Sequence, residues 1–358
     1  MSKLDMIMVG CGGIANSWLP VIRDNKDVDL VAVCDPIPLQ FKKLEKFEEF
    51  KDVPTFSDLA MAFMEVDADA TLILTPSQYH ARYLMESIEN ATHCISEKCF
   101  FTEMNQYRHL LNAAELAKEY DLTCVVNQQY RFMDRCQKIR ETIANGTIGQ
   151  IGMVMSNFCQ NRYHFNSWWR SQHQDLSQFN WYVHHYDTMR FFLDANPVTV
   201  RAKLIRPPWT KIVGESSIFL NVLFDNGIEW GYNATQEGVA GFQDTKHTTF
   251  TMYGDKGTIT NSRNEGSNAW VEGADGERKQ IEIEPPNEAE YAAKYPPGWD
   301  VTLKKFVESV ETGKPHPTRF EDNFYTMAIA MCARKSHELG GVDVSVKDYM
   351  GLDVDNPN

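Results

Sequence analysis

Short apolar runs alternate with segments of helical periodicity through the first 130 residues. The apolar runs predict buried strands, and helices are expected between them. The expected strands are residues 4–9, 30–34, 53–56, 70–74, 93–96 and 123–127. One helix is expected to begin near Gly13. Further helices are expected at 39–50, 58–64, 80–90 and 103–120, and Ser57 is the expected N-cap of the helix 58–64. This alternation predicts a parallel, doubly wound α/β sheet.

The pattern changes after residue 130 and becomes richer in alternating strands. Strands are predicted at 151–160, 198–205, 216–224, 228–235, 248–253 and 257–260, with a hairpin at Asn226-Gly227. Helices are expected at 132–144, 180–192, 299–311 and 320–339, and polar loops at 264–278 and 285–297. We therefore predict two domains, an α/β nucleotide-binding domain of residues 1–125 and a second domain, 126–358, with a largely antiparallel sheet.

The first predicted strand runs directly into Gly10-Cys11-Gly12-Gly13-Ile14-Ala15, which matches the dinucleotide-binding pattern G-x-G-x-x-A. In that pattern Gly10 permits the turn, Gly12 lets the backbone approach a pyrophosphate, and Ala15 lets the helix pack closely. The N-terminus of that helix would face the phosphates with unpaired N–H groups and the positive end of its dipole. The alternative is a structural glycine turn without a ligand.

Asp35 ends the second predicted strand, twenty residues after Ala15. An acidic residue at this place accepts hydrogen bonds from the ribose hydroxyls of NAD, and it would repel the 2′-phosphate of NADP. The predicted cofactor is therefore NAD rather than NADP. The alternative is an unrelated surface aspartate.

Polar residues follow the other predicted strands, and the carboxyl ends of parallel strands meet at one edge of a sheet. Thr75-Pro76, Glu97-Lys98 and Asn127 should therefore lie near Gly10 and Asp35. Lys98, partly removed from water, would have a lowered pKa suited to proton transfer; the alternative is a solvated lysine paired with Glu97.

Polar and aromatic residues are dense between 157 and 190. If 180–192 is helical, Asn180, His184 and Asp187 share one face, and His185 is turned away from it. Aromatic, amide and charged side chains together suit a polyol substrate. We expect it to be held by Tyr163, Trp168, Arg170, Asn180 and His185. The alternatives are packing residues, or a metal site, which the histidine spacing does not favour.

Composition narrows the class of protein. The formal net charge of −14 over 358 residues disfavours nucleic-acid binding, and no apolar run approaches a membrane span. The eight cysteines are scattered without a C-x-x-C pair, so reduced thiols and a cytoplasmic location are expected.

The ordered set of motifs resembles the Gfo/Idh/MocA family of sugar and inositol oxidoreductases. The set comprises Gly10 to Ala15, Asp35-Pro36, Thr75-Pro76 with His80, Glu97-Lys98, Gln129 to Phe132, Gly146 to Gly149, Trp169-Arg170 and His184-x-x-Asp187. The resemblance implies a Rossmann domain followed by an α/β domain whose open, mostly antiparallel sheet often forms the interface of a homodimer or homotetramer. It places Ile14, Thr75, Pro76, His80 and Glu97 at the cofactor. His80 alternatively belongs only to the first turn of its helix.

The resemblance also implies hydride exchange between NAD(P) and the carbinol of a sugar or cyclitol. Lys98 matches the lysine of the family's Glu-Lys-Pro motif, and His184 the histidine of Asp-x-Gly-x-His-x-x-Asp. Two positions depart from the pattern. Cys99 replaces the proline, and Asn180 and Tyr182 replace the aspartate and glycine, so the usual charge partner of the histidine is absent.

The sequence therefore predicts an NAD-dependent dehydrogenase that oxidises a sugar, cyclitol or glycoside, with Lys98 and His184 as catalytic residues. One alternative is a redox-cycling glycosidase or lyase that leaves NAD unchanged overall. Another is a nucleotide-sensing regulator without catalysis, which Asn180 favours and the retained Lys98 and His184 oppose.

Overall fold

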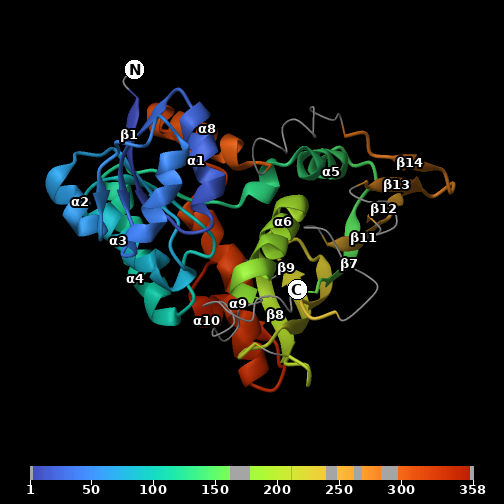
Figure 1. Ribbon diagram of the computed structural model, residues 1–358. Coiled ribbons are helices and arrows are strands. Elements are labelled where there is room, and N and C mark those ends of the chain that lie inside the picture. Colours follow the sequence, from blue (N-terminus) through green and yellow to red (C-terminus); the bar gives the residue numbers. More distant parts are fainter. Residues whose placement is uncertain are drawn as a thin grey trace. The chain divides into compact units, whose positions relative to one another are not determined.

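The computed structural model describes residues 3–161, 178–210, 212–238, 248–261, 268–283 and 297–354 (Figure 1). By its contacts the chain forms two compact units. Unit 1 comprises Met1–Phe132 and Pro285–Asn323, and unit 2 comprises Met133–Glu284 and Phe324–Asn358. The chain thus leaves unit 1, builds most of unit 2 and then returns. The predicted division into domains 1–125 and 126–358 stays a prediction. It does not account for the segment Pro285–Asn323, which belongs to unit 1.

Unit 1 contains one sheet of parallel strands. The strands are β1 (Leu4–Val9), β2 (Val28–Cys34), β3 (Thr55–Phe56), β4 (Ala70–Ile73), β5 (His93–Ser96) and β6 (Cys124–Val126). Their order is β3-β2-β1-β4-β5-β6, so the predicted doubly wound sheet is confirmed. The order reverses between β1 and β4, which is the place where such sheets bind ligands.

The helices of unit 1 largely follow the predicted periodicity. They are α1 (Ala15–Asp24), α2 (Leu59–Glu65), α3 (His80–Glu89), α4 (Met104–Glu119) and α8 (Trp299–Thr312), with short 3₁₀ turns η2 (Ser77–Tyr79) and η3 (Gln129–Phe132). The predicted helix 39–50 is instead a 3₁₀ helix, η1 (Pro38–Lys46). Its apolar residues recur every third position, at 41, 44 and 47, which matches the three-residue turn of a 3₁₀ helix. The N-cap of α2 is Asp58 and not Ser57.

The returning segment completes the core of unit 1. The ring centroids of Trp299, at the start of α8, and Trp18 of α1 lie 5.1 Å apart, and both residues belong to one apolar core cluster with residues of the sheet. Thr318 donates through its hydroxyl to the Val126 carbonyl at 2.7 Å, and its own carbonyl accepts from the Val126 N–H at 2.9 Å. Unit 1 is therefore closed by residues that follow unit 2 in the sequence.

Unit 2 is built on a second sheet. Its strands are β7 (Ile151–Cys159), β8 (Pro197–Ile205), β9 (Ser217–Phe224), β10 (Glu229–Thr235), β11 (Thr249–Gly254), β12 (Gly257–Asn261), β13 (Trp270–Gly273), β14 (Arg278–Gln280) and β15 (Val344–Ser345). The order is β14-β13-β12-β11-β7-β10-β9-β8-β15, and all described pairs are antiparallel except β7 with β10. The predicted mostly antiparallel sheet is confirmed, although β13 falls in a segment predicted as a loop.

Helices accompany this sheet. They are α5 (Asp134–Ala144), α6 (Val183–Leu193), α9 (Phe320–Glu338) and α10 (Val346–Met350); the last part of α9, from residue 324, belongs to unit 2. A π-helical turn, η6 (Gln178–Tyr182), leads into α6. No helix in the described part of the chain has the length and apolar character needed to cross a bilayer.

Candidate functional site

The glycine turn after β1 combines one residue that the protein requires with two that leave space. Gly10 has φ +99°, and a Cβ there would lie 2.9 Å from the backbone of Leu74, so only glycine fits between β1 and β4. A Cβ added at Gly12 or at Gly13 would meet no other atom of the described residues within 4 Å. The turn and the start of α1 thus form an open cradle lined by backbone, which fits a pyrophosphate.

Asp35 lies beside this turn, as predicted. Its Oδ2 accepts the Cys11 N–H at 2.8 Å and its Oδ1 accepts the Ile37 N–H at 2.9 Å. Each carboxylate oxygen keeps a second lone pair. The two backbone bonds fix the carboxylate, and the remaining lone pairs are available to ribose hydroxyls.

Lys43 is a residue of this region that the sequence analysis did not select. Its Nζ donates to the Cys11 carbonyl at 2.8 Å and to the Gln40 side chain. Burial raises the pKa of the Cys11 thiol to about 11, with Lys43 lowering it and Asp35 raising it. The 3₁₀ winding of η1 brings Lys43 to the glycine turn. This contact could not be predicted, because the sequence pattern indicated an ordinary helix over 39–50.

The end of β4 also offers a polar atom toward a ligand. The Thr75 hydroxyl is buried, and no described residue forms a hydrogen bond with it. A buried hydroxyl without a partner is costly unless a ligand or water supplies one. Pro76, which follows, precedes the 3₁₀ turn η2. Together with the cradle at Gly12 and Gly13, Thr75 makes this edge of the sheet fit a dinucleotide.

His80 joins the loops after β4 and β5. Its Nδ1 lies 2.7 Å from the Cys99 carbonyl and its Nε2 lies 2.6 Å from the Thr75 carbonyl, and the residue is 1% exposed. Burial lowers the pKa of His80 to about 4, although the two carbonyls oppose this shift. Both ring nitrogens are thus occupied by the protein. The place of His80 at the cofactor, which the resemblance implies, stays a prediction.

Glu97 and Lys98 follow β5 at the same edge. Glu97 Oε1 accepts Trp18 Nε1 at 3.0 Å and Asn127 Nδ2 at 2.7 Å, while Asn127 accepts the Thr302 hydroxyl at 3.1 Å. Burial raises the pKa of the Glu97 carboxyl, against the opposing effects of Lys98 and these bonds. Lys98 is half-buried, and its peptide bond to Cys99 is cis. The strand ends that the sequence brought together are therefore neighbours in unit 1.

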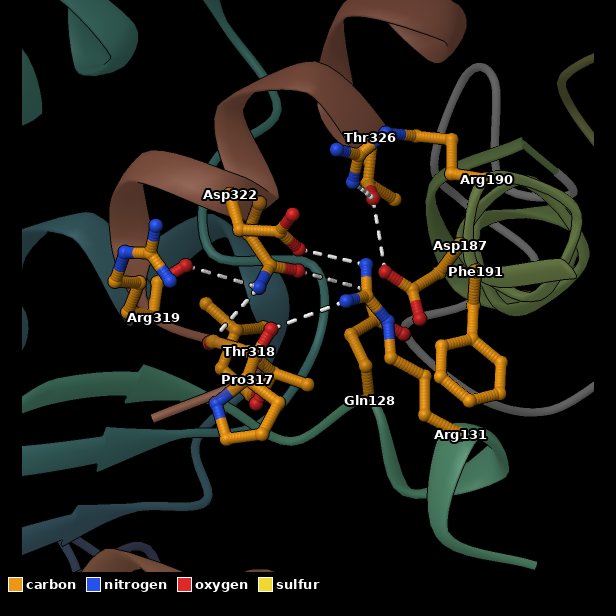
Figure 2. A network of polar contacts seen from close by, with 12 residues as sticks. Gln128, Arg131, Asp187, Arg190, Phe191, Pro317, Thr318, Arg319, Asp322 and Thr326 are labelled. Carbon is orange, nitrogen blue, oxygen red and sulfur yellow. Dashed lines mark hydrogen bonds and ion pairs between the residues drawn. The ribbon is translucent and has the colours of Figure 1, made fainter. Parts of the chain in front are cut away.

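The candidate residues of unit 2 begin at α6. His184 is buried as the second residue of this helix. One turn later, buried Asp187 accepts the Thr326 hydroxyl at 2.9 Å, and the same hydroxyl accepts Arg190 Nη1 at 2.8 Å (Figure 2). These bonds tie α6 to α9 within unit 2 and fix the helix that carries His184.

Other residues predicted to hold the substrate have different outcomes. His185 is a core residue, because its Nδ1 lies 2.6 Å from the Tyr232 hydroxyl and its ring packs 4.5 Å from that of Phe158. Asn180 lies in the π-helical turn η6, whose wider winding changes the α-helical face predicted for Asn180 and His184. The Asn180 side chain, and Tyr163, Trp168 and Arg170 entirely, lie outside the described residues.

A parallel sheet in this order, with a glycine turn after β1 and an acidic residue after β2, defines a Rossmann dinucleotide-binding protein. The chain belongs to the Gfo/Idh/MocA oxidoreductase family. Residues 4–128 match the model of the family's NAD-binding Rossmann fold, and residues 140–346 match its C-terminal alpha/beta domain. NAD is accordingly the cofactor, and the predicted oxidoreductase class is confirmed at the level of the family.

Individual relatives share this fold at low identity. D-apiose dehydrogenase of Rhizobium rhizogenes is 23% identical over 72% of this chain and 73% of its own. An oxidoreductase from Agrobacterium radiobacter, crystallised with NAD+, L-tartaric acid and magnesium, has a TM-score of 0.84 at 19% identity, covering 97% of this chain and 99% of its own. The WlbA dehydrogenase from Bordetella pertussis, crystallised with NADH and UDP-GlcNAcA, has a TM-score of 0.80 at 21% identity and 99% coverage of both chains.

Proposed function

We propose that the protein is an NAD-dependent dehydrogenase that oxidises a carbinol of a sugar, cyclitol or glycoside. The observation that carries the proposal is the meeting of the open glycine turn, Asp35 and Glu97-Lys98 at one edge of the unit 1 sheet. The names of the relatives support the substrate class, since one acts on D-apiose and another was crystallised with UDP-GlcNAcA.

The cofactor side rests on groups already described. The backbone at Gly12 and Gly13 would hold the pyrophosphate, Asp35 the ribose hydroxyls, and the Thr75 hydroxyl a further polar group. When bound, NAD accepts the hydride that leaves the carbinol carbon. The protein must therefore take the hydroxyl proton, so that a C–H and an O–H bond break as the carbonyl forms.

We assign that proton to Lys98 Nζ, with His184 as the second candidate. Lys98 is half-buried, and the neighbouring Glu97 is held in place by Trp18 and Asn127. The backbone that carries Lys98 is thus anchored through Glu97, as the positioning of a general base requires.

The test is activity of the full chain with NAD on a panel of sugars, cyclitols and glycosides, following both NADH and glycoside cleavage. NADH formation supports the dehydrogenase. Cleavage without net NADH indicates the redox-cycling enzyme, and NAD binding with neither product indicates the regulator. Lys98→Ala should lower kcat by roughly 10² or more and leave the Kd of NAD within a few fold. Lys118→Ala, at an exposed position of α4, is the matched control, and equal kcat in both variants would remove Lys98 from the mechanism.

We also propose that the outer face of the unit 2 sheet joins copies of the chain into a homo-oligomer, a dimer or a tetramer. Met153 and Met155 of β7, Phe219 of β9 and Tyr253 of β11 are exposed there. Exposed apolar side chains gathered on one sheet face are typical of an association surface. Light scattering measures the molar mass of the protein and of its Met155→Lys variant. We expect an oligomer for the unmodified protein and a lower molar mass for the variant.

A further inference from the structure

Arg135 is a buried arginine for which the described chain supplies no partner. It is 7% exposed, and neither its Nε nor its Nη2 has a hydrogen-bond acceptor among the described residues. A guanidinium carries five N–H donors and stays charged, so burying it without an acceptor is strongly unfavourable. Buried charges persist in proteins where an opposite charge meets them, in the chain or in a ligand.

Other arginines of unit 2 show how the protein treats a guanidinium that serves structure. Arg190 donates to Thr326 at 2.8 Å (Figure 2). It also donates to Asn196 at 2.6 Å. Arg140 pairs with Asp194 at 2.9 Å and also donates to the Phe191 carbonyl. Arg135, on the same helix as Arg140, has no such bonds in the described part of the chain.

The contacts between α5 and α6 place Arg135 at the same end of the helix pair as His184. The charge of Asp187 in α6 raises the pKa of the Cys136 thiol in α5, in addition to the larger effect of burial. One turn later in α5, Arg140 donates to the Phe191 carbonyl and pairs with Asp194. Both sets of contacts advance in the same direction, so the two helices begin at the same end. Arg135 and His184 are each the second residue of their helix.

Electrostatics at this end of the helix pair favours an anion. The N-terminus of α5, which carries Asp134 in its first turn, contributes partial positive charge there, and neither Nε nor Nη2 of Arg135 donates to a carboxylate of the described residues. Burial lowers the pKa of the Arg135 guanidinium, which is the direction expected for a cation that lacks a counter-charge. The planar fork of a guanidinium matches the two oxygens of a carboxylate.

We propose that Arg135 binds the carboxylate of the substrate, and that the substrate is therefore a sugar acid of the aldonic or uronic class. This inference rests on the proposed function, because it assigns the substrate of the same site. The pyrophosphate of the cofactor is the other candidate anion, but the glycine turn that receives it lies in unit 1, whereas Arg135 and His184 belong to unit 2. A carboxylate on Arg135 would fix the orientation of a sugar whose carbinol reacts near His184.

The experiment measures binding to the full chain loaded with NADH, which prevents turnover of an alcohol. Three matched pairs serve as probes: D-glucuronate with D-glucose, D-galacturonate with D-galactose, and D-gluconate with D-glucitol. We expect at least one acid to bind roughly 30-fold or more tightly than its neutral counterpart, and Arg135→Gln to abolish that preference. Arg135→Lys should restore part of it. Lys138→Gln, which removes one positive charge from an exposed position of the same helix, should retain it fully.

Three results would overturn the inference. They are equal binding of acid and neutral sugar in every pair, a preference that survives Arg135→Gln, or a loss of NADH affinity in that variant in place of a loss of acid affinity.

A second experiment measures the thermal unfolding of an Arg135 variant. Arg135→Met should unfold at the same temperature as the unmodified protein or higher, since it removes an unpaired buried charge. A lower midpoint would show that Arg135 has a structural partner. Failure of the dehydrogenase proposal is distinguishable, because it appears as no NADH from any sugar while the acid preference remains.

Discussion

His80→Ala should weaken both the fold and the catalysis, because one imidazole joins the loops that follow β4 and β5. The ring lies 2.7 Å from the Cys99 carbonyl and 2.6 Å from the Thr75 carbonyl, and it is 1% exposed. A neutral imidazole donates one proton, so one carbonyl loses a true hydrogen bond on substitution. Leaving a buried acceptor without a partner costs about 1–3 kcal/mol, and the vacated ring volume adds a similar amount.

The free energy of unfolding that His80→Ala loses should decrease as the pH falls. The pKa of His80 falls from 6.5 to about 4 on folding, so the folded protein binds fewer protons than the unfolded chain between these values. The stability contributed by the neutral ring is complete above pH 6.5 and is lost as pH falls toward 4. At 1.36 kcal/mol per unit this linkage amounts to about 3 kcal/mol. The stability difference between the protein and His80→Ala should therefore shrink by that amount from pH 7.5 to pH 4.

Urea unfolding at several pH values measures the stability, and NADH formation measures kcat. We expect a loss of about 2–4 kcal/mol at pH 7.5 and a fall in kcat of at least 10-fold, because Cys99 adjoins Lys98. His93→Ala is the matched control: it removes one bond, from the Thr123 N–H, at the opposite end of β5. It should lower stability and leave kcat unchanged. A stability difference that is constant with pH, or equal kcat in the two variants, would refute the reasoning.

Three further predictions follow from the site. NAD should bind more tightly than NADP because Asp35 repels a 2′-phosphate. Titration of both cofactors measures the two Kd values, and a lower Kd for NADP would contradict the prediction. Gly10→Ala should cost several kcal/mol in unfolding experiments, since its Cβ would lie 2.9 Å from the Leu74 backbone; a fold of unchanged stability would argue against the close approach. Asn180→Asp should raise the pKa of His184 and move the acidic limb of the kcat/KM profile to higher pH, whereas superimposable limbs would separate the two residues.

The sequence predicted the strands of unit 1 well because a buried parallel strand is a continuous apolar run. The predicted bounds of β1 and β5 agree with the structure to the residue. It missed β13 and β14 because their residues are half-buried or exposed and show no apolar alternation. It missed the 3₁₀ winding of η1 because a spacing of three residues is shared by both kinds of helix.

For the site, the topology of parallel strands was sufficient to bring Gly10, Asp35 and Lys98 to one edge. Lys43 could not be selected in the same way, because its place depends on the winding of a short helix. The lack of hydrogen-bond acceptors around Arg135 among the described residues could likewise not be predicted from the sequence. It depends on the residues that pack around the side chain in the fold, and these are not its neighbours in sequence.

The return of the chain to unit 1 has a consequence for synthesis on the ribosome. Trp299, Leu303, Phe306 and Val307 of α8 belong to an apolar core cluster of the Rossmann unit, and Thr318 pairs with the edge strand β6. These residues leave the ribosome only after the whole of the second sheet except β15 has been made. The nucleotide-binding half, although it precedes the second sheet in the sequence, must therefore keep part of its apolar surface uncovered until α8 has been synthesised. A fragment that ends at residue 132 should accordingly aggregate or bind chaperones.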